Sequence, residues 1–324
     1  NDTIAVWLWY NIKKGVSLNS YAESLVPIAN DQWFADQLKK GTLCYDAKNK
    51  EYIPSVLYYS GNIYDKIQNL VTYKSLFADI NLLDQYELQS KNLKNILPPA
   101  LKLTGKKDER LVLSVLSSFV KNFEINIDGE NKTILSAFKD YLRGLDDSDL
   151  KYNVRPWHIV NYYIDGDRMP NSWDKVEKIN IKRNAAQECV LQITKFLAEE
   201  ITTTEQERIE FAWNKQNNGY VDVSYDKIPL FMEFSKYFKK KVLEIRDAQR
   251  EGIAFQTSNG TGIIAYDVGV GKTLTAILNI GYAMQNGICK RPLIVVPKPT
   301  YEKWIGEING IYEDGNLVLS GLLP

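Results

Sequence analysis

One short stretch near the end of the chain limits its possible folds more than any other. Residues 262–266 are an apolar strand candidate, a glycine-rich turn follows, and a helix is expected from Lys272 to about Asn286. A second apolar strand candidate, residues 293–297, comes next. Strand, helix and strand with short joints are typical of a βαβ unit in a parallel sheet. We therefore predict an α/β lobe with parallel strands here.

The turn inside this unit has the composition of a phosphate-binding loop. It reads Asp267, Val268, Gly269, Val270, Gly271, Lys272 and Thr273. Its glycines allow backbone N–H groups to point at phosphate oxygens, and the following helix presents its positive N-terminus to the same anion. Lys272 is expected to reach the β- and γ-phosphates, and Thr273 to offer its hydroxyl to Mg²⁺. The consensus GxxxxGKS/T would have its first glycine at 271 − 5 = 266, where this chain has Tyr266.

Two neighbouring segments extend this interpretation. Gln249 lies about one helix ahead of the loop, and its two-sided amide can read the adenine edge. Lys298 and Thr300 follow the second strand candidate, at the strand end where ligands bind in such sheets, so they are candidates for contact with a nucleic-acid phosphate. The alternatives are an ordinary glutamine on an amphipathic helix and a solvated loop. Trp304, further on, favours a packing role.

Read together, these segments resemble three motifs of superfamily-two helicases. Gln249 resembles the glutamine motif, Ala265 to Thr273 motif I, and Leu293 to Trp304 motif Ia. The Val-Pro-Lys…Trp form is similar to the Swi/Snf branch of double-strand DNA translocases. The resemblance implies a RecA-like lobe that binds ATP and Mg²⁺, with DNA as the partner.

The loop is closer still to one group, in which large phage and mobile-element proteins join an adenine-specific DNA methylase to a Swi/Snf-type helicase. Upstream stretches resemble the same group, so the resemblance runs from about residue 40 to about residue 320. These stretches are Gly41 to Asp46, Tyr58 to Ile63 with Lys66 and Ile67, Ala185 to Phe196, and Glu207 to Val221.

The chain also departs from that pattern. It has no Asn-Pro-Pro-Tyr methylase motif, no Asp-Glu-x-His motif after the loop, and no second motor lobe with an arginine finger. Asn1 in place of Met and the apolar end of the chain indicate a segment of a longer protein. The remaining motor lobe, and a methylase domain, are then expected partners in the same parent chain. We expect this segment to bind ATP weakly and to hydrolyse it slowly, because no residue in it is recognisable as the catalytic acid or the finger.

Apolar stripes at helical spacing predict that residues 1–240 form a mainly helical accessory domain, followed by the partial RecA-like lobe over residues 241–324. The clearest stripes are Ile63, Ile67, Leu70, Val71 and Phe77, and Ala185, Cys189, Ile193, Phe196 and Leu197.

Local signals predict three further helices in that region. Thr204 with Glu207 is a capping-box signature, Asp108 is a candidate cap for a helix that reaches Val120, and Pro229 suits the first turn of a helix through Lys240. Residues 41–53 and 154–164 favour strands or irregular structure.

Composition excludes several classes of protein. The 40 basic and 40 acidic residues balance, so the net charge of the chain gives no sign of nucleic-acid binding. Only a local groove lined by basic residues could still bind nucleic acid. Cys44, Cys189 and Cys289 are scattered, which argues against zinc and disulfide frameworks and fits reduced thiols in cytoplasm. No apolar run is long enough to span a membrane. We therefore expect a cytoplasmic protein, and the resemblance given above implies a bacterial host or a phage, with packaging in a virion left open.

Two other functions compete with the motor. One is a different phosphate-loop enzyme, such as a kinase or GTPase, although Asn309 to Asp314 supplies no guanine-reading motif. The other is a structural phage component that keeps the fold without turnover. Residues 1–240 contain no recognisable constellation of catalytic residues. His158, the only histidine, is more typical of a packed side chain.

Overall fold

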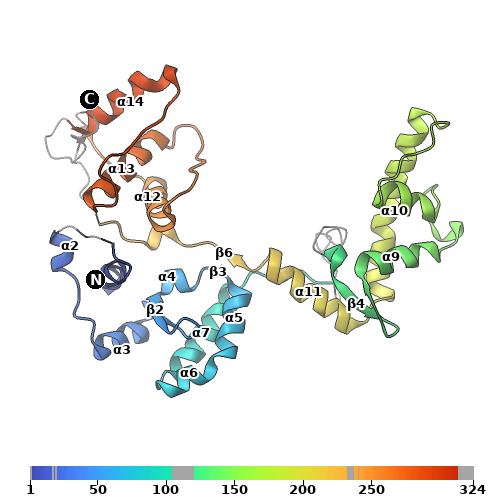
Figure 1. Ribbon diagram of the computed structural model, residues 1–324, viewed down its shortest axis with the longest axis horizontal. Helices are drawn as coiled ribbons and strands as arrows, with labels where there is room; N and C mark the ends of the chain where they lie inside the picture. Colours follow the sequence, from blue (N-terminus) through green and yellow to red (C-terminus); the bar gives the residue numbers. More distant parts are fainter. Residues whose placement is uncertain are drawn as a thin grey trace. The chain divides into compact units, whose positions relative to one another are not determined.

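The computed structural model describes residues 2–16, 18, 20–103, 120–231, 237–239 and 241–312, and these are mostly helical (Figure 1). The chain divides into two compact units, one formed by Asn1–Ile96 with Val221–Pro324 and the other by Leu97–Tyr220. The boundary predicted near residue 240 falls inside the first unit, because the N-terminal segment packs with the C-terminal part of the chain.

The first unit combines short helices with two small antiparallel hairpins, β1–β2 and β7–β8. Its N-terminal elements are α1 (Asp2–Lys13), α2 (Ser20–Ser24), α3 (Asp31–Lys40), β1 (Leu43–Asp46), β2 (Glu51–Pro54), α4 (Ser55–Tyr58), β3 (Gly61–Asn62), α5 (Ile63–Thr72), α6 (Lys74–Asp79) and α7 (Leu83–Ile96). Its C-terminal elements are η4 (Tyr225–Lys227), β7 (Tyr237–Phe238), β8 (Lys241–Val242), α12 (Asp247–Asn259), α13 (Lys272–Gln285), η5 (Lys298–Thr300) and α14 (Tyr301–Tyr312), and β6 (Tyr220–Val221) lies where the two units meet in sequence.

One apolar cluster joins the start of this unit to its end. Trp7 of α1, Ile228 and Ala254 of α12 are all buried together, at 5%, 8% and 1% exposure. Burial of such large side chains is the main favourable term in folding. The first helix of the chain is therefore part of the support for α12.

A buried glutamine secures the first hairpin. Gln89 of α7 accepts a hydrogen bond from the Tyr45 N–H at 3.0 Å and donates to the Tyr45 carbonyl at 3.1 Å. A planar amide can satisfy the N–H and the carbonyl of one residue, and a buried backbone requires such partners. The strand-like prediction for residues 41–53 is confirmed by this hairpin.

The second unit is built around two helices and one antiparallel hairpin. Its elements are η1 (Val120–Asn122), β4 (Glu124–Ile127), β5 (Glu130–Thr133), α9 (Ile134–Arg143), η2 (Asp147–Asp149), the π-helix η3 (His158–Ile164), α10 (Lys175–Glu199) and α11 (Thr203–Asn217). Residues 154–164, expected to be a strand or irregular, thus contain a π-helix instead. The cap predicted at Asp108 lies outside the described residues.

The predicted apolar stripe of α10 is confirmed. Ala185, Cys189, Ile193, Phe196 and Leu197 are each at most 1% exposed and pack against Phe138 and Leu142 of α9 in one core.

Buried polar side chains of the second unit hold irregular backbone segments in place. Asn214 of α11 accepts from the Leu101 N–H at 2.9 Å and donates to its carbonyl at 3.0 Å. Glu188 of α10 accepts from the N–H groups of Lys151 and Tyr152, both at 2.9 Å. These bonds attach irregular segments to α10 and α11. They also give hydrogen-bond partners to buried polar groups that would otherwise destabilise the core.

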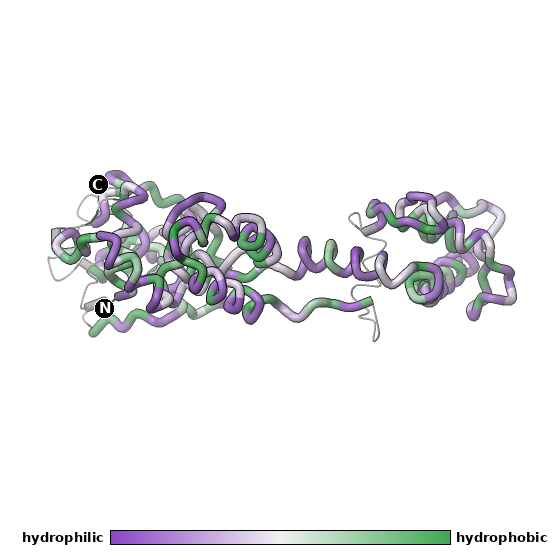
Figure 2. Tube along the Cα trace, turned by 90° about the horizontal axis from the view of Figure 1, so that it is seen from below, coloured by the Kyte–Doolittle hydropathy of each residue, from purple (hydrophilic) through white to green (hydrophobic). Residues whose placement is uncertain are grey.

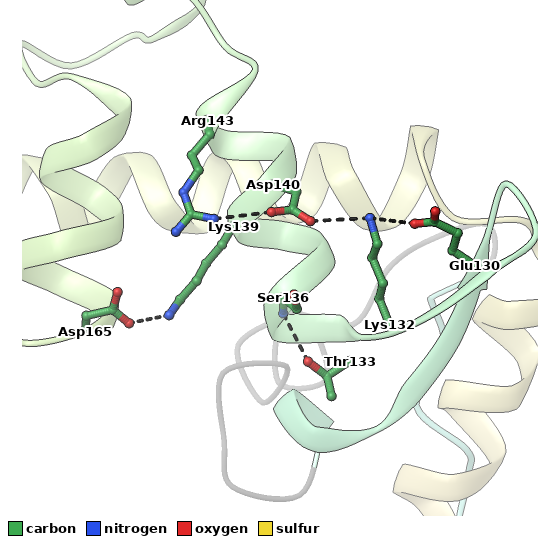
Figure 3. A network of polar contacts seen from close by, with 8 residues as sticks. All are labelled: Glu130, Lys132, Thr133, Ser136, Lys139, Asp140, Arg143 and Asp165. Carbon is green, nitrogen blue, oxygen red and sulfur yellow. Dashed lines mark hydrogen bonds and ion pairs between the residues drawn. The ribbon is translucent and has the colours of Figure 1, made fainter.

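The surface of α9 carries a chain of charged contacts, shown in Figure 3. Lys132 lies 3.1 Å from Glu130 and 3.5 Å from Asp140, which also pairs with Arg143 at 3.2 Å. Thr133 caps the helix by accepting from the Ser136 N–H at 3.2 Å. Exposed ion pairs contribute little to stability, so the cap and the buried face of α9 position this helix.

Two local predictions need correction. α11 begins after Thr202, whose hydroxyl accepts from the Glu205 N–H at 3.3 Å, whereas Thr204 is exposed within the first turn. The helix predicted from Pro229 through Lys240 is also wrong over residues 237–239, which belong to the β7–β8 hairpin and its turn. Tertiary pairing outweighs the weak preference of proline for a first helical turn.

The two segments predicted to be parallel strands have no regular secondary structure and no strand partner among the described residues. Residues 262–266 and 293–297 belong to no ladder. Their side chains nevertheless alternate, with Ile263, Leu293 and Val295 exposed by 89%, 87% and 85% and Ile294 packed against the α13–α14 core. An extended backbone places alternate side chains on opposite faces, and parallel strands are normally covered on both.

Apolar and polar residues are interspersed along both units (Figure 2). No helix in the described part of the chain is long and apolar enough to cross a membrane. The three cysteines are free, and burial raises the pKa of Cys44 and of Cys189 to about 12.

Candidate nucleotide-binding site

The glycine-rich loop connects two helices that pack closely on each other. Ile253 of α12 packs with Leu278 and Tyr282 of α13 in a buried cluster. Gly252 lets the helices approach, because a Cβ there would lie 2.9 Å from Thr275 Cγ2. Thr275 is fully buried, and its hydroxyl donates to the Gly271 carbonyl at 3.2 Å. The start of α13 is thereby held against α12.

Both loop glycines adopt a conformation that other residues rarely do. Gly269 has φ 91° and Gly271 has φ 97°, in the left-handed region. A Cβ at Gly269 would meet nothing within 4 Å, so this side of the loop is open. A Cβ at Gly271 would lie 2.4 Å from Gln249 Nε2. The loop thus requires glycine at 271 both for its backbone angle and for its contact with α12.

Lys272 and Thr273 stand at the N-terminus of the 14-residue helix α13. Lys272 Nζ donates to the carbonyls of Tyr266 at 2.7 Å and Asp267 at 3.1 Å. The Thr273 hydroxyl makes no hydrogen bond to any residue that the structure describes. An open glycine loop, a lysine held on loop carbonyls and a hydroxyl with no hydrogen bond to a described residue fit a phosphate group with its Mg²⁺.

Gln249 is directed at the loop rather than into solvent. It is 4% exposed, its Oε1 accepts from the Arg246 N–H at 3.0 Å, and its Nε2 donates to the Val270 carbonyl at 3.2 Å. Gln249 thus contacts the loop at Val270, and each end of its amide makes one hydrogen bond to the protein backbone. Val268, at the tip of the loop, is 98% exposed.

Lys298 and Thr300 form the turn η5 that leads into α14. The Thr300 hydroxyl donates to the Pro297 carbonyl at 2.8 Å, and Lys298 is exposed. Trp304 packs beside Ile308 in the core shared by α13 and α14, so its predicted packing role is confirmed.

Residues 204–318 match the family model of the SNF2-related domain. The match includes the loop, Gln249 and η5, and it begins in α11 of the second unit. Neither a curated protein nor a solved structure matches the chain.

The sequence did not predict how Tyr266, the residue just before the loop, is held. The Tyr266 hydroxyl donates a hydrogen bond to the Ala248 carbonyl of α12. The only sequence signal for this contact is the tyrosine at the position of the first consensus glycine. In the part of the chain that the structure describes, no group of acidic, cysteine or histidine side chains could hold a metal ion by itself.

Proposed function

We propose that this chain binds ATP with Mg²⁺ and forms the nucleotide-binding part of an SNF2-type, ATP-dependent DNA translocase. The observation that carries the proposal is the loop at residues 267–273, with two left-handed glycines and Lys272 at the start of a long helix, inside the SNF2-related match. Backbone N–H groups of residues 268–271 would hold phosphate oxygens, Lys272 would neutralise them, and Thr273 would ligate Mg²⁺.

Two further contacts belong to this proposal. Gln249 would read adenine with the second N–H of its Nε2 and the second lone pair of its Oε1, since its bonds to the Val270 carbonyl and the Arg246 N–H use only one of each. Lys298 and Thr300 would contact the DNA backbone, and residues 262–266 and 293–297 would pair as parallel strands of the RecA-like lobe. Ile263, Leu293 and Val295 support the pairing, because their exposed apolar side chains suit strands covered on both faces.

The 324-residue chain is expected to bind ATP but to turn it over slowly. Phosphoryl transfer needs a group that orients water and a cation that meets the developing charge, and an arginine finger alone contributes about 10³- to 10⁵-fold in related enzymes. No Asp-Glu-x-His segment follows the loop in this sequence. The role that we propose for this chain is therefore nucleotide binding.

The test is calorimetric titration of the chain with Mg·ATP, with Lys272→Ala as the variant. Loss of a charge-assisted contact should weaken binding about 10- to 100-fold. Lys290→Ala, which removes another exposed lysine of the same unit, is the matched control and should bind as the wild type does. Equal affinities for the wild type and Lys272→Ala would refute the proposal, and fast Lys272-dependent phosphate release would refute its non-catalytic part.

The proposed DNA contact has its own test. Replacing Lys298 by alanine should lower the magnitude of the slope of log K against log salt by about one, because one phosphate contact releases about one counterion. Lys195→Ala, on the exposed side of α10, should leave the slope unchanged. The measurement uses duplex DNA and a salt series. An unchanged slope for Lys298→Ala would remove Lys298 from the interface.

A further inference from the structure

Tyr266 joins the phosphate loop to the helix that precedes it. Its hydroxyl donates to the Ala248 carbonyl in the first turn of α12, while its own carbonyl accepts from Lys272 Nζ at 2.7 Å. Burial raises the pKa of Tyr266 above its ordinary value, so the hydroxyl is a protonated donor at neutral pH. One residue thus connects α12 with the lysine of the loop.

The space for this hydroxyl is provided by a glycine. Gly252 lies one helical turn after Ala248, and a Cβ on it would stand 2.6 Å from the Tyr266 hydroxyl oxygen. Glycine is unfavourable in the interior of a helix, so its presence in the middle of α12 needs a packing reason. The close approach of Tyr266 and Thr275 to Gly252 is that reason.

The loop is attached to α12 at both ends by adjacent residues. Tyr266, just before the loop, bonds to Ala248, and Val270, near its end, accepts from Gln249 at 3.2 Å. Between these two points Gly269 has open space on its Cβ side. A loop that is held at both ends loses less conformational freedom when it closes on a ligand, and that preorganisation raises affinity.

We propose that the Tyr266 hydroxyl is a positioning group for phosphate binding, which holds the start of the phosphate loop on α12 so that Lys272 can move from the loop carbonyls to a nucleotide phosphate. The inference rests on the proposed function. Tyr266 acts through the loop backbone and does not itself touch the nucleotide. Its effect should therefore fall on the phosphate part of the ligand and not on the base.

The first experiment compares Tyr266→Phe with the wild-type chain in calorimetric titrations with Mg·ATP and with Mg·tripolyphosphate. Loss of one hydrogen bond should weaken both ligands about three- to tenfold and by the same factor. Tyr220→Phe, which removes a hydroxyl from a side chain that is 70% exposed, is the matched control. A merely structural role would lower the fraction of competent protein, and hence the stoichiometry, without changing the dissociation constant.

The second experiment tests whether Gly252 and the hydroxyl act together. Gly252→Ala should weaken phosphate binding in the wild type, and the penalty should be smaller in Tyr266→Phe, where the displaced oxygen is absent. Gly306→Ala, at a helical position with no neighbour within 4 Å of the added Cβ, should have no effect in either background. Strictly additive effects of Gly252→Ala and Tyr266→Phe would overturn the coupling.

The outcomes separate the two proposals. If Lys272→Ala loses binding while Tyr266→Phe keeps wild-type affinity for both ligands, the role of Tyr266 is wrong and the proposed function stands. If the wild type binds neither ligand, or Lys272→Ala binds as well as the wild type, the proposed function fails and this inference fails with it. If Tyr266→Phe weakens ATP but not tripolyphosphate, the hydroxyl serves the base and the positioning role is overturned.

Discussion

His158 is the only histidine of the chain, and its surroundings favour the neutral form of the imidazole. It is 8% exposed at the start of η3, and its Nδ1 accepts from the Arg155 N–H at 3.1 Å. Burial, followed by the nearby Arg155 charge, lowers the pKa of His158 below its usual range. Rings of Trp157, Tyr162 and Trp173 surround it, which supports the packing role expected from the sequence.

This environment predicts how stability depends on pH. The unfolded chain takes up a proton on His158 below about pH 6.5, whereas the folded chain resists it until the pH reaches the lowered folded pKa. The stability of the second unit should therefore decline as the pH falls from about 6.5 through that lower value. Urea denaturation between pH 7.5 and 5.5 measures it, and His158→Asn, which keeps an acceptor for Arg155, should flatten the profile. An equally steep decline in the variant would contradict this origin.

The start of α11 shows how neighbouring residues compete to cap one helix. Three consecutive threonines, Thr202, Thr203 and Thr204, lie at the start of α11, and each has a side chain that can cap a helix. The sequence favours Thr204, because Glu207 completes a capping box with it. In the structure Thr202 is the cap, so the helix begins two residues earlier than predicted. This start places Glu205, Gln206 and Ile209 on the buried face of the helix. Gln206 Nε2 then donates to the carbonyls of Leu197 and Ile201 at 2.8 and 3.0 Å, which fixes the turn between α10 and α11.

A pair of alanine substitutions tests this register. Thr202→Ala removes the oxygen that accepts from the Glu205 N–H and should destabilise the second unit by about 1 kcal/mol. Thr204→Ala changes an exposed residue inside the first turn and should be close to neutral, since alanine suits a helix. Chemical denaturation of both variants gives the two values. A larger loss for Thr204→Ala than for Thr202→Ala would restore the cap that the sequence favours.

At the scale of the whole molecule, Asn1–Ile96 and Val221–Pro324 form one compact unit, and Leu97–Tyr220 form the other. Trp7, near the start of the chain, and Ala254, in α12, are 247 positions apart in sequence (254 − 7 = 247) yet lie in one buried cluster. Part of the segment expected to form the accessory domain thus packs on α12, which borders the candidate nucleotide site.

Reciprocal core substitutions test the division. Trp7→Ala should destabilise the first unit by about 3–5 kcal/mol, and with it reduce hydrogen-exchange protection in α12 and α13. Phe138→Ala, at a fully buried position of α9, should reduce protection in α9 and α10 by a similar amount. Each variant should leave the other unit protected, because each unit has its own core. Loss of protection throughout the chain in either variant would show a single cooperative unit.

The sequence by itself determined the features that depend on local chemistry. The loop at residues 267–273 follows from backbone freedom at Gly269 and Gly271 and from a cation beside them, which neighbours in the chain supply. The helical stripe of α10 was equally predictable, because a 3.6-residue period places Ala185, Cys189 and Ile193 on one face whatever covers them.

Tertiary structure decided what depends on residues far apart in sequence. It placed α1 beneath α12 through Trp7, brought Tyr266 to the Ala248 carbonyl, and turned the Gln249 amide toward Val270. Among the residues that the structure describes, residues 262–266 and 293–297 belong to no sheet, although their apolar pattern predicts strands. A periodic pattern tells which face of a segment is apolar, but it does not tell what covers that face or which group accepts from a given backbone N–H. Those partners are decided by packing and hydrogen bonding between segments that are distant in sequence, and these interactions form only in the folded chain.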